Sequence, residues 1–206
     1  MELLKKRLAQ INLVLATFAA FLLSLDKRLL IWTLATWAFF WLVGIILDPK
    51  RLVALHNRWF YLMVGFYLLH GVGLLYTSNM EAGAFEMEVK FSFLIIPLIF
   101  FSSPEVVARR KYLYTSFVAG VIAGGVFCFI YAAYRLYNGV LGAMYYMSFS
   151  YFHHPTYFAL FACFSAVILF RTLERRKMVF SKKSFFPVIL LFFLSSVLYF
   201  LSSKAG

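Results

Sequence analysis

The stretch YLYTSFVAGVIAGGVFCFIYAAY, residues 112–134, contains no charged side chain. A helix needs about 20 predominantly apolar residues to cross the hydrocarbon of a bilayer, and this stretch is long enough. Its apolar side chains fall on every face of a helix, whereas a membrane-barrel strand alternates apolar and polar positions. Backbone groups inside a bilayer must satisfy each other, so residues 112–134 predict a transmembrane helix.

Six further apolar blocks of similar length flank this one. All seven occupy residues 8–25, 29–47, 59–76, 84–103, 112–134, 151–170 and 185–202. The 206-residue chain is 64% hydrophobic and 14% charged, whereas soluble domains are about 45–50% apolar and about 25% charged. The sequence therefore predicts an all-α, polytopic integral membrane bundle of about seven transmembrane helices, with residues 1–206 forming one transmembrane domain. The first block is interpreted as a retained span, because no small-residue cleavage site for a signal peptidase follows it.

The basic residues are concentrated in alternate segments between the blocks. Fifteen of the 20 lie before the first block or after the second, fourth and sixth, in groups of three, three, three and six. Cytoplasmic loops of membrane proteins carry an excess of Lys and Arg, so this bias predicts a cytoplasmic N-terminus and an outer C-terminus. The net charge of +12 then needs no nucleic-acid partner. The stretch RTLERRKMVFSKK, residues 171–183, could bind a polyanion, but it lies where an orienting loop is expected.

The fourth block, residues 84–103, is too short to span unless the helix also includes Glu86, Glu88 and Lys90. Charges inside a span are costly and are candidates for a functional site. The simpler interpretation is an ion pair between Glu86 and Lys90, which are four residues apart on a helix, with Glu88 on another face. We expect Pro97 to kink or break this helix.

Two adjacent histidines, His153 and His154, precede Pro155 where the sixth block begins. The predicted topology places them at the outer membrane boundary, where proline suits the first turn of a helix. They could be polar caps of that helix, or they could bind or protonate an anionic substrate. A metal site is disfavoured, because adjacent histidines point apart and no third ligand is near in the sequence.

Sequence motifs of soluble enzyme classes are missing. The chain has no P-loop, no HExxH zinc motif and no GxSxG nucleophile elbow. Most aromatic residues near block ends are interpreted as interface anchors. The glycines of GVIAGG, residues 120–125, provide a face for close helix packing.

Three stretches resemble bacterial O-antigen ligase and O-antigen polymerase proteins, particularly the Bacteroidetes type. They are YTSNMEAGAFEMEVKFSFLIIPLIFFSSP (residues 76–104), FHHPTYFALF (residues 152–161) and the terminal LSSKAG (residues 201–206), with Lys204 where arginine is more usual. The resemblance covers about residue 50 to the end. It implies a multi-pass glycosyltransferase of the bacterial inner membrane with a periplasmic active face.

The resemblance also implies substrates and site residues. Such an enzyme moves a glycan from undecaprenyl pyrophosphate to a lipid A core or another glycan chain, with no metal or other cofactor. Basic residues bind the pyrophosphate, and a base activates the acceptor hydroxyl. The substrate-binding candidates are the outer polar residues Glu88, Lys90, Arg135, His153, His154 and Lys204. Arginine and lysine would meet the diphosphate as charge-assisted donors.

Family members continue through further spans and a large periplasmic loop with an essential histidine and arginine. The expectation is therefore that residues 1–206 are the N-terminal half of such a protein, a truncated form whose catalytic residues are unknown and which pairs with a C-terminal half or with a second copy. Two alternatives stay open: a non-catalytic membrane assembly subunit and a transporter. A transporter is disfavoured, because six of the seven blocks carry no Asp, Glu, Lys or Arg at mid-depth.

Overall fold

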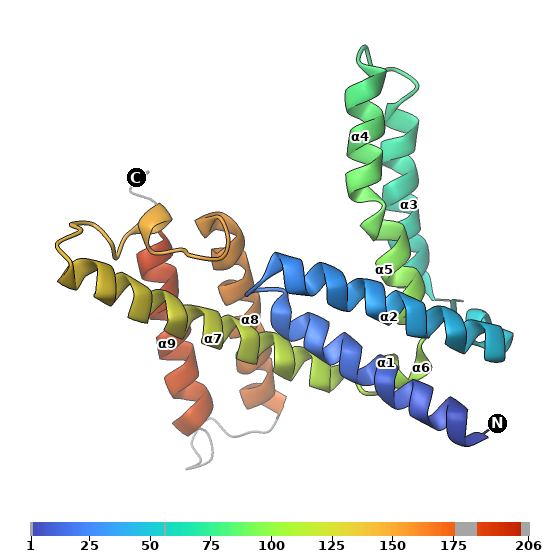
Figure 1. Ribbon diagram of the computed structural model, residues 1–206, viewed down its shortest axis with the longest axis horizontal. Coiled ribbons are helices and arrows are strands. Elements are labelled where there is room, and N and C mark those ends of the chain that lie inside the picture. Colours follow the sequence, from blue (N-terminus) through green and yellow to red (C-terminus); the bar gives the residue numbers. More distant parts are fainter. Residues whose placement is uncertain (1, 56, 176–184, 203–206) are drawn as a thin grey trace. The chain divides into compact units, whose positions relative to one another are not determined.

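The computed structural model describes residues 2–55, 57–175 and 185–202. Every regular element within these ranges is helical, so the all-α prediction is confirmed (Figure 1). The elements in chain order are α1 (Glu2–Leu22), α2 (Lys27–Leu47), the 3₁₀ helix η1 (Pro49–Leu55), α3 (Arg58–Gly73), α4 (Met80–Lys90), α5 (Ser92–Phe101), α6 (Pro104–Ala108), α7 (Arg110–Tyr137), the 3₁₀ helix η2 (Tyr146–Ser148), α8 (Pro155–Arg175) and α9 (Phe185–Leu201). The candidate Lys204 and the basic residues 176–183 lie outside the described ranges.

Among the residues that the structure describes, three helices, α2, α7 and α8, are long and apolar enough to cross a membrane. The other predicted spans are shorter or more charged. Helix α3 has 16 residues and α9 has 17, whereas α1 has 21 but begins with Glu2, Lys5, Lys6 and Arg7. Three apolar helices indicate a membrane protein, and the total of seven spans stays a prediction.

The chain packs as two compact units. Unit 1 comprises residues 1–16 and 34–110, and unit 2 comprises residues 17–33 and 111–206. Helices α1 and α2 each contribute one part to each unit.

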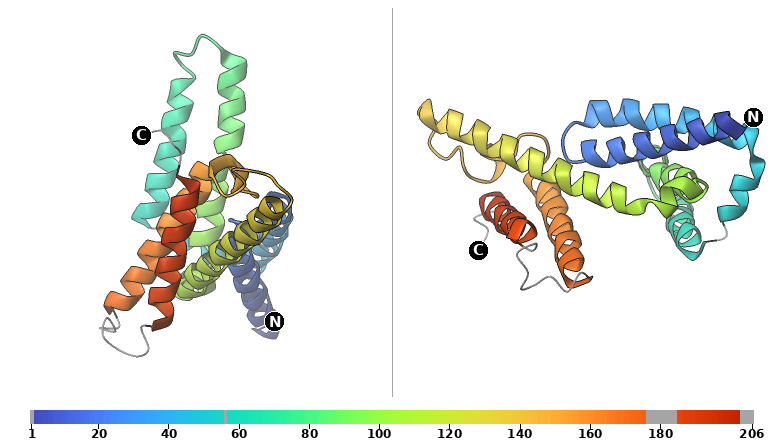
Figure 2. Two further views of the ribbon diagram at one scale, coloured as in Figure 1. Left: turned by 90° about the vertical axis from the view of Figure 1, so that its left-hand side faces the viewer. Right: turned by 90° about the horizontal axis from the view of Figure 1, so that it is seen from below.

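In unit 1, α3 forms an antiparallel hairpin with α4 and α5 (Figures 1 and 2). Aromatic edges hold the two sides together: the ring centroids of Phe66 and Phe93 are 5.2 Å apart, and those of Tyr67 and Phe91 are 6.1 Å apart. Helices α3 and α4 each have an asparagine N-cap. Asn57 accepts a hydrogen bond from the N–H of Trp59, and Asn79 accepts one from the N–H of Ala82.

The predicted fourth span is interrupted at Phe91, between α4 and α5, and not at Pro97. Pro97 lies inside α5. A proline removes one backbone donor and crowds the carbonyl four residues before it, here that of Phe93, so the irregularity at Phe91 lies outside the turn that Pro97 affects. The Phe91 N–H donates to the carbonyl of Glu88, three residues back, at 3.1 Å, and the next helix restarts from the Phe91 carbonyl. The break expected at Pro97 therefore lies at Phe91, where two short helices, α4 and α5, meet.

In unit 2, glycines of α7 allow close packing by neighbouring helices. A β-carbon on Gly120 would overlap the backbone carbonyl of Phe21 in α1, and one on Gly125 would lie 3.0 Å from Val197 of α9. Helices α8 and α9 lie side by side (Figure 2). The core contains the fully buried side chains of Phe149, Phe158 and Leu194, together with others on α7, α8 and α9. The predicted close-packing face of GVIAGG is therefore used within the chain itself.

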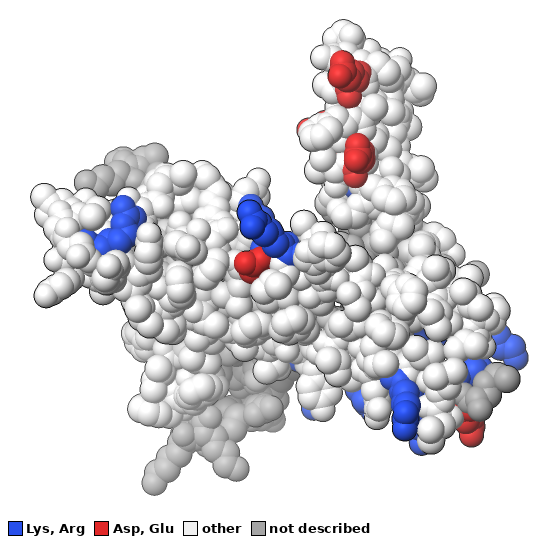
Figure 3. Space-filling view, in the orientation of Figure 1, with Lys and Arg blue, Asp and Glu red and all other residues white. Residues whose placement is uncertain are grey.

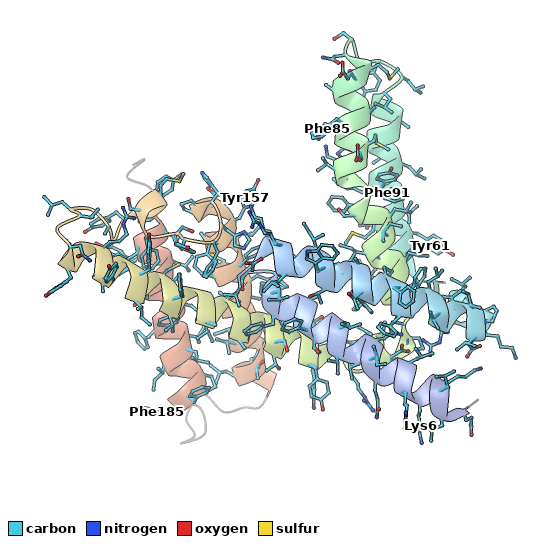
Figure 4. All side chains as sticks on the ribbon, in the orientation of Figure 1. Lys6, Tyr61, Phe85, Phe91, Tyr157 and Phe185 are labelled. Atoms are coloured by element: carbon cyan, nitrogen blue, oxygen red, sulfur yellow. The ribbon has the colours of Figure 1, made fainter. Side chains whose placement is uncertain are left out.

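The surface is largely apolar. Charged side chains are sparse on the face shown in Figure 3. Phe85, Tyr157 and Phe185 project from their helices into the surroundings (Figure 4) and are 63%, 61% and 71% exposed. Large exposed apolar surfaces are unusual for soluble monomers and normal for helices that face lipid.

Candidate functional site

The loop between α7 and α8, residues 138–154, carries two predicted site residues of unit 2, His153 and His154, and begins one turn after a third, Arg135. It begins with a Schellman cap. The N–H of Val140 donates to the carbonyl of Arg135 at 3.0 Å and that of Gly139 to the carbonyl of Leu136 at 3.0 Å. Gly139 has the positive φ of 80° that this cap requires, a conformation that favours glycine. The cap ends α7 and turns the chain back along that helix, so that Tyr151 and Phe152 pack against Phe127.

Phe149 anchors the loop to α7 and α9. Its side chain is completely buried, with ring centroids 4.9 Å from Phe129 of α7 and 5.6 Å from Phe200 of α9. A buried aromatic ring contributes a large apolar area to packing. The loop is therefore fixed to the helices beneath it.

Arg135 lies in the last turn of α7 and ties the loop to that helix. Its Nη1 donates to the carbonyl of Ser148 at 3.1 Å, and its guanidinium carbon lies 5.8 Å from the ring centroid of Tyr131. The ring of Tyr151 packs edge-on to Tyr131, with centroids 4.8 Å apart. A guanidinium has five N–H donors, and the described contacts use one. Arg135 thus supports the loop and retains donors for an anion.

His153 is held against the interior of unit 2. Its ring lies edge-on to Phe161 at 5.6 Å, and its Nε2 is buried with no hydrogen-bond partner within the described part of the chain. Burial lowers the pKa of His153 below its ordinary value of 6.5, and the positive charge of Lys27 lowers it further, against a smaller opposing effect of the Leu23 backbone. A protonated ring would be disfavoured there, so His153 is suited to an uncharged role near neutral pH.

His154 is exposed and begins α8. Its carbonyl accepts hydrogen bonds from the N–H groups of Tyr157 and Phe158 at 3.0 and 3.2 Å, and its Nδ1 accepts from Thr156 at 3.4 Å. Pro155 is the first residue of α8, as predicted. Residues 151–154, the first four of the sixth apolar block, belong to the loop and not to the helix. The geometry of His154 is that of a polar helix cap.

Glu88 and Lys90 belong to α4 of unit 1. Lys90 forms the predicted ion pair with Glu86, one helical turn away. Glu88 is exposed on another face and forms no ion pair with the residues that the structure describes. Lys90 is therefore partly neutralised, whereas Glu88 keeps a free carboxylate.

Unit 1 also contains a buried ion pair that the sequence reading missed. Arg51 Nη1 of η1 and Glu105 Oε1 of α6 are 3.0 Å apart, with side chains 11% and 12% exposed. Asn12 of α1 donates its Nδ2 to the same carboxylate oxygen at 3.3 Å. A buried charge needs a partner of this kind. Separations of 54 and 93 residues leave no local sequence signal, and the only available hint was an acid in the short segment after Pro104.

Three of the six predicted substrate-binding residues lie at the two ends of the α7–α8 loop, Arg135 just before its start and the two histidines at its end. Arg135, His153 and His154 border one loop of unit 2, Glu88 and Lys90 lie on α4 of unit 1, and Lys204 falls beyond the described residues. Within the described ranges, no three His, Cys, Asp or Glu side chains gather in a way that could hold a metal ion. No family model, curated protein or solved structure matches this chain.

Proposed function

We propose that this chain acts in the bacterial inner membrane in the assembly of cell-surface polysaccharide, as an O-antigen ligase- or polymerase-like protein. The substrate is a glycan on undecaprenyl pyrophosphate, and the acceptor is a lipid A core or a growing glycan. The chain crosses the membrane seven times with its N-terminus in the cytoplasm, so that the α7–α8 loop faces the periplasm.

The observation that supports this proposal best is the arrangement of the α7–α8 loop. Arg135 and the two histidines border one structured loop, next to the α8 start whose HPTYF sequence carries the family resemblance. Arginine is well suited to diphosphate, because its planar fork makes two parallel charge-assisted hydrogen bonds. The proposal assigns contacts to the pyrophosphate-linked substrate to basic residues of each unit separately, Lys90 in unit 1 and Arg135 and Lys204 in unit 2, and the shaping of the helix start to His153 and His154.

The packing of α7 weakens one alternative. A non-catalytic assembly subunit would need a small-residue face left free for another chain. Gly120, Gly124 and Gly125 of α7 are instead covered by side chains or backbone of the same unit. Residues with small side chains at close helix crossings thus serve the fold of this chain.

The test is deletion of the natural gene followed by restoration with variants, read as the lipopolysaccharide ladder. Loss of all long glycan on lipid A indicates a ligase, and a single repeat unit indicates a polymerase. Arg135→Ala and Lys90→Ala are each expected to reduce transfer about tenfold or more at normal protein level, because each removes a charge-assisted contact.

Arg171→Ala is the matched control. Arg171 lies near the other end of α8, pairs with Glu174 and is assigned no substrate. This variant is expected to keep the ladder. An unchanged ladder after deletion of the gene would refute the proposed function, and full activity in both Arg135→Ala and Lys90→Ala would refute the assignment of the pyrophosphate site.

A further inference from the structure

Unit 1 contains an apolar groove between the middle of α2 and the α4–α5 pair. Its volume is about 370 Å³. Leu34 of α2 and Ile95, Ile96 and Ile99 of α5 contribute apolar walls. Ile96 is 41% exposed, so the groove opens to the surroundings of a helix, α2, that is itself apolar enough to cross a membrane.

Two polar groups in this groove have no partner in the described part of the chain. Trp37 is 4% exposed, and its indole N–H is buried without an acceptor. Glu88 lines the same groove, and its carboxylate forms no ion pair or hydrogen bond with a described residue. An unpaired buried donor is costly, and in a bilayer no water is present to satisfy it. The Trp37 N–H therefore needs a hydrogen-bond acceptor, and the Glu88 carboxylate needs a cation or an N–H donor. A ligand that carries both an acceptor and such a donor would satisfy the two groups.

We propose that the groove binds a phospholipid with a primary-amine head group, such as phosphatidylethanolamine. The lipid ammonium pairs with the Glu88 carboxylate, an acyl ester carbonyl accepts from the Trp37 indole, and one acyl chain lies along the isoleucines of α5. This lipid supplies all three elements: a cation, an acceptor and an apolar chain.

The charge of Glu88 also excludes other lipids from the groove. A carboxylate repels phosphatidylglycerol and polyprenyl pyrophosphates, whose head groups are anionic and bring no compensating cation. An isoprenoid chain, moreover, has no acceptor for the Trp37 N–H. The groove is thus a site for a membrane lipid that is distinct from the glycan carrier, and the inference does not depend on the proposed transferase activity.

The experiment uses the purified full chain in phosphatidylcholine vesicles doped with a photoactivatable lipid. Three probes with the same photoreactive group are compared: phosphatidylethanolamine and phosphatidylglycerol, which carry it on an acyl chain, and polyprenyl phosphate, which carries it on the isoprenoid chain. Crosslinked peptides are mapped by mass spectrometry. The ethanolamine probe is expected to label residues 34–38 and 92–99 about tenfold more than the glycerol probe, as one charge-assisted contact implies.

Matched variants assign the preference to its groups. Glu88→Gln is expected to abolish the preference for the ethanolamine probe over the glycerol probe. Glu81→Gln, in the first turn of the same helix and outside the groove lining, is expected to keep this preference. Trp37→Phe removes only the indole N–H and is expected to lower labelling by the ethanolamine probe about threefold, whereas Trp59→Phe on exposed α3 surface does not.

Equal labelling by the three probes, or an ethanolamine preference that survives in Glu88→Gln, would overturn the proposal. Stronger labelling by polyprenyl phosphate would also overturn it and identify a carrier-lipid groove instead. None of these readouts measures glycan transfer, so failure of this inference is distinguishable from failure of the proposed function.

Discussion

Adjacent histidines in this chain have opposite surroundings. His153 packs against Phe161 with its Nε2 buried, whereas His154 is exposed and caps α8. The Ser150 hydroxyl donates to the His153 carbonyl at 2.6 Å and so fixes the backbone between the loop and the helix. With the backbone fixed in this way, the His153 ring faces the interior of unit 2 and the His154 ring is exposed.

The burial of His153 predicts a pH-dependent stability of the α7–α8 loop. Its pKa is lowered in the folded state, first by burial and then by Lys27. The unfolded chain, whose histidine has the ordinary pKa of about 6.5, therefore binds more protons below that value than the folded chain does. Stability is fully present above pH 6.5 and is lost as the pH falls from there toward the lowered pKa. Thermal unfolding in detergent between pH 8 and pH 5 is the measurement.

The control for this prediction is the neighbouring ring. His153→Asn is expected to remove the pH dependence between pH 6.5 and pH 5, although burial of the amide lowers stability at all pH values. His154→Asn is expected to keep the pH dependence. A wild-type chain equally stable at pH 8 and pH 5 would contradict the argument.

The sequence predicted some of the candidate site at the residue scale and missed the rest for a physical reason. Local spacing predicted the ion pair between Glu86 and Lys90 and the position of Pro155 in the first turn of α8, since both depend on residues within one helical turn. The ion pair between Arg51 and Glu105 depends on which helices meet in space. Local patterns carry no information on such meetings.

At the scale of elements, apolar length predicted where most helices lie. The block at residues 29–47 corresponds to α2 (Lys27–Leu47), and the block at 185–202 corresponds to α9 (Phe185–Leu201). The fourth block was the exception. Its backbone restarts at Phe91, because helix continuity depends on the hydrogen bonds of each turn and not on the hydropathy of the segment.

Helix packing in unit 2 predicts that Gly120 tolerates no side chain. The backbone carbonyl carbon of Phe21 would lie 3.0 Å from a β-carbon there and the Ser24 hydroxyl 3.1 Å. A backbone contact cannot move aside as a side chain can, so Gly120→Ala is expected to lower the free energy of unfolding by about 1–3 kcal/mol. Thermal unfolding of the purified protein measures this loss.

Gly65→Ala provides the comparison for Gly120→Ala. Gly65 lies in the middle of α3, and a β-carbon there would meet no described atom within 4 Å. Alanine has a higher helix propensity than glycine by about 1 kcal/mol, so this variant is expected to be neutral or stabilising. Equal destabilisation by the two substitutions would show that the close approach of α1 and α7 is not the cause.

At the scale of the whole molecule, charge and hydropathy act together. Apolar side chains cover much of the surface, and the basic residues are concentrated in alternate connecting segments. The sequence predicted this organisation because the membrane selects for composition along the chain, which needs no knowledge of long-range contacts. The division into two units was not predictable from composition, because apolar blocks with the same hydropathy contribute to both.

The distribution of basic residues predicts the orientation of the chain, which reporter fusions test directly. Lys111 lies in the first turn of α7, directly after Arg109 and Arg110, whereas Asn138 directly follows the last residue of α7 and has one basic residue, Arg135, near it. Since loops rich in Lys and Arg stay in the cytoplasm, fusions after Lys111 and Lys182 are expected to be cytoplasmic and a fusion after Asn138 periplasmic.

Each site is fused in turn to alkaline phosphatase, which is active only in the periplasm, and to green fluorescent protein, which does not fluoresce when it is exported. The two readouts therefore check each other. Phosphatase activity after Lys182 would place the most basic connecting segment outside. That result would contradict both the orientation and the assignment of the α7–α8 loop to the periplasmic face.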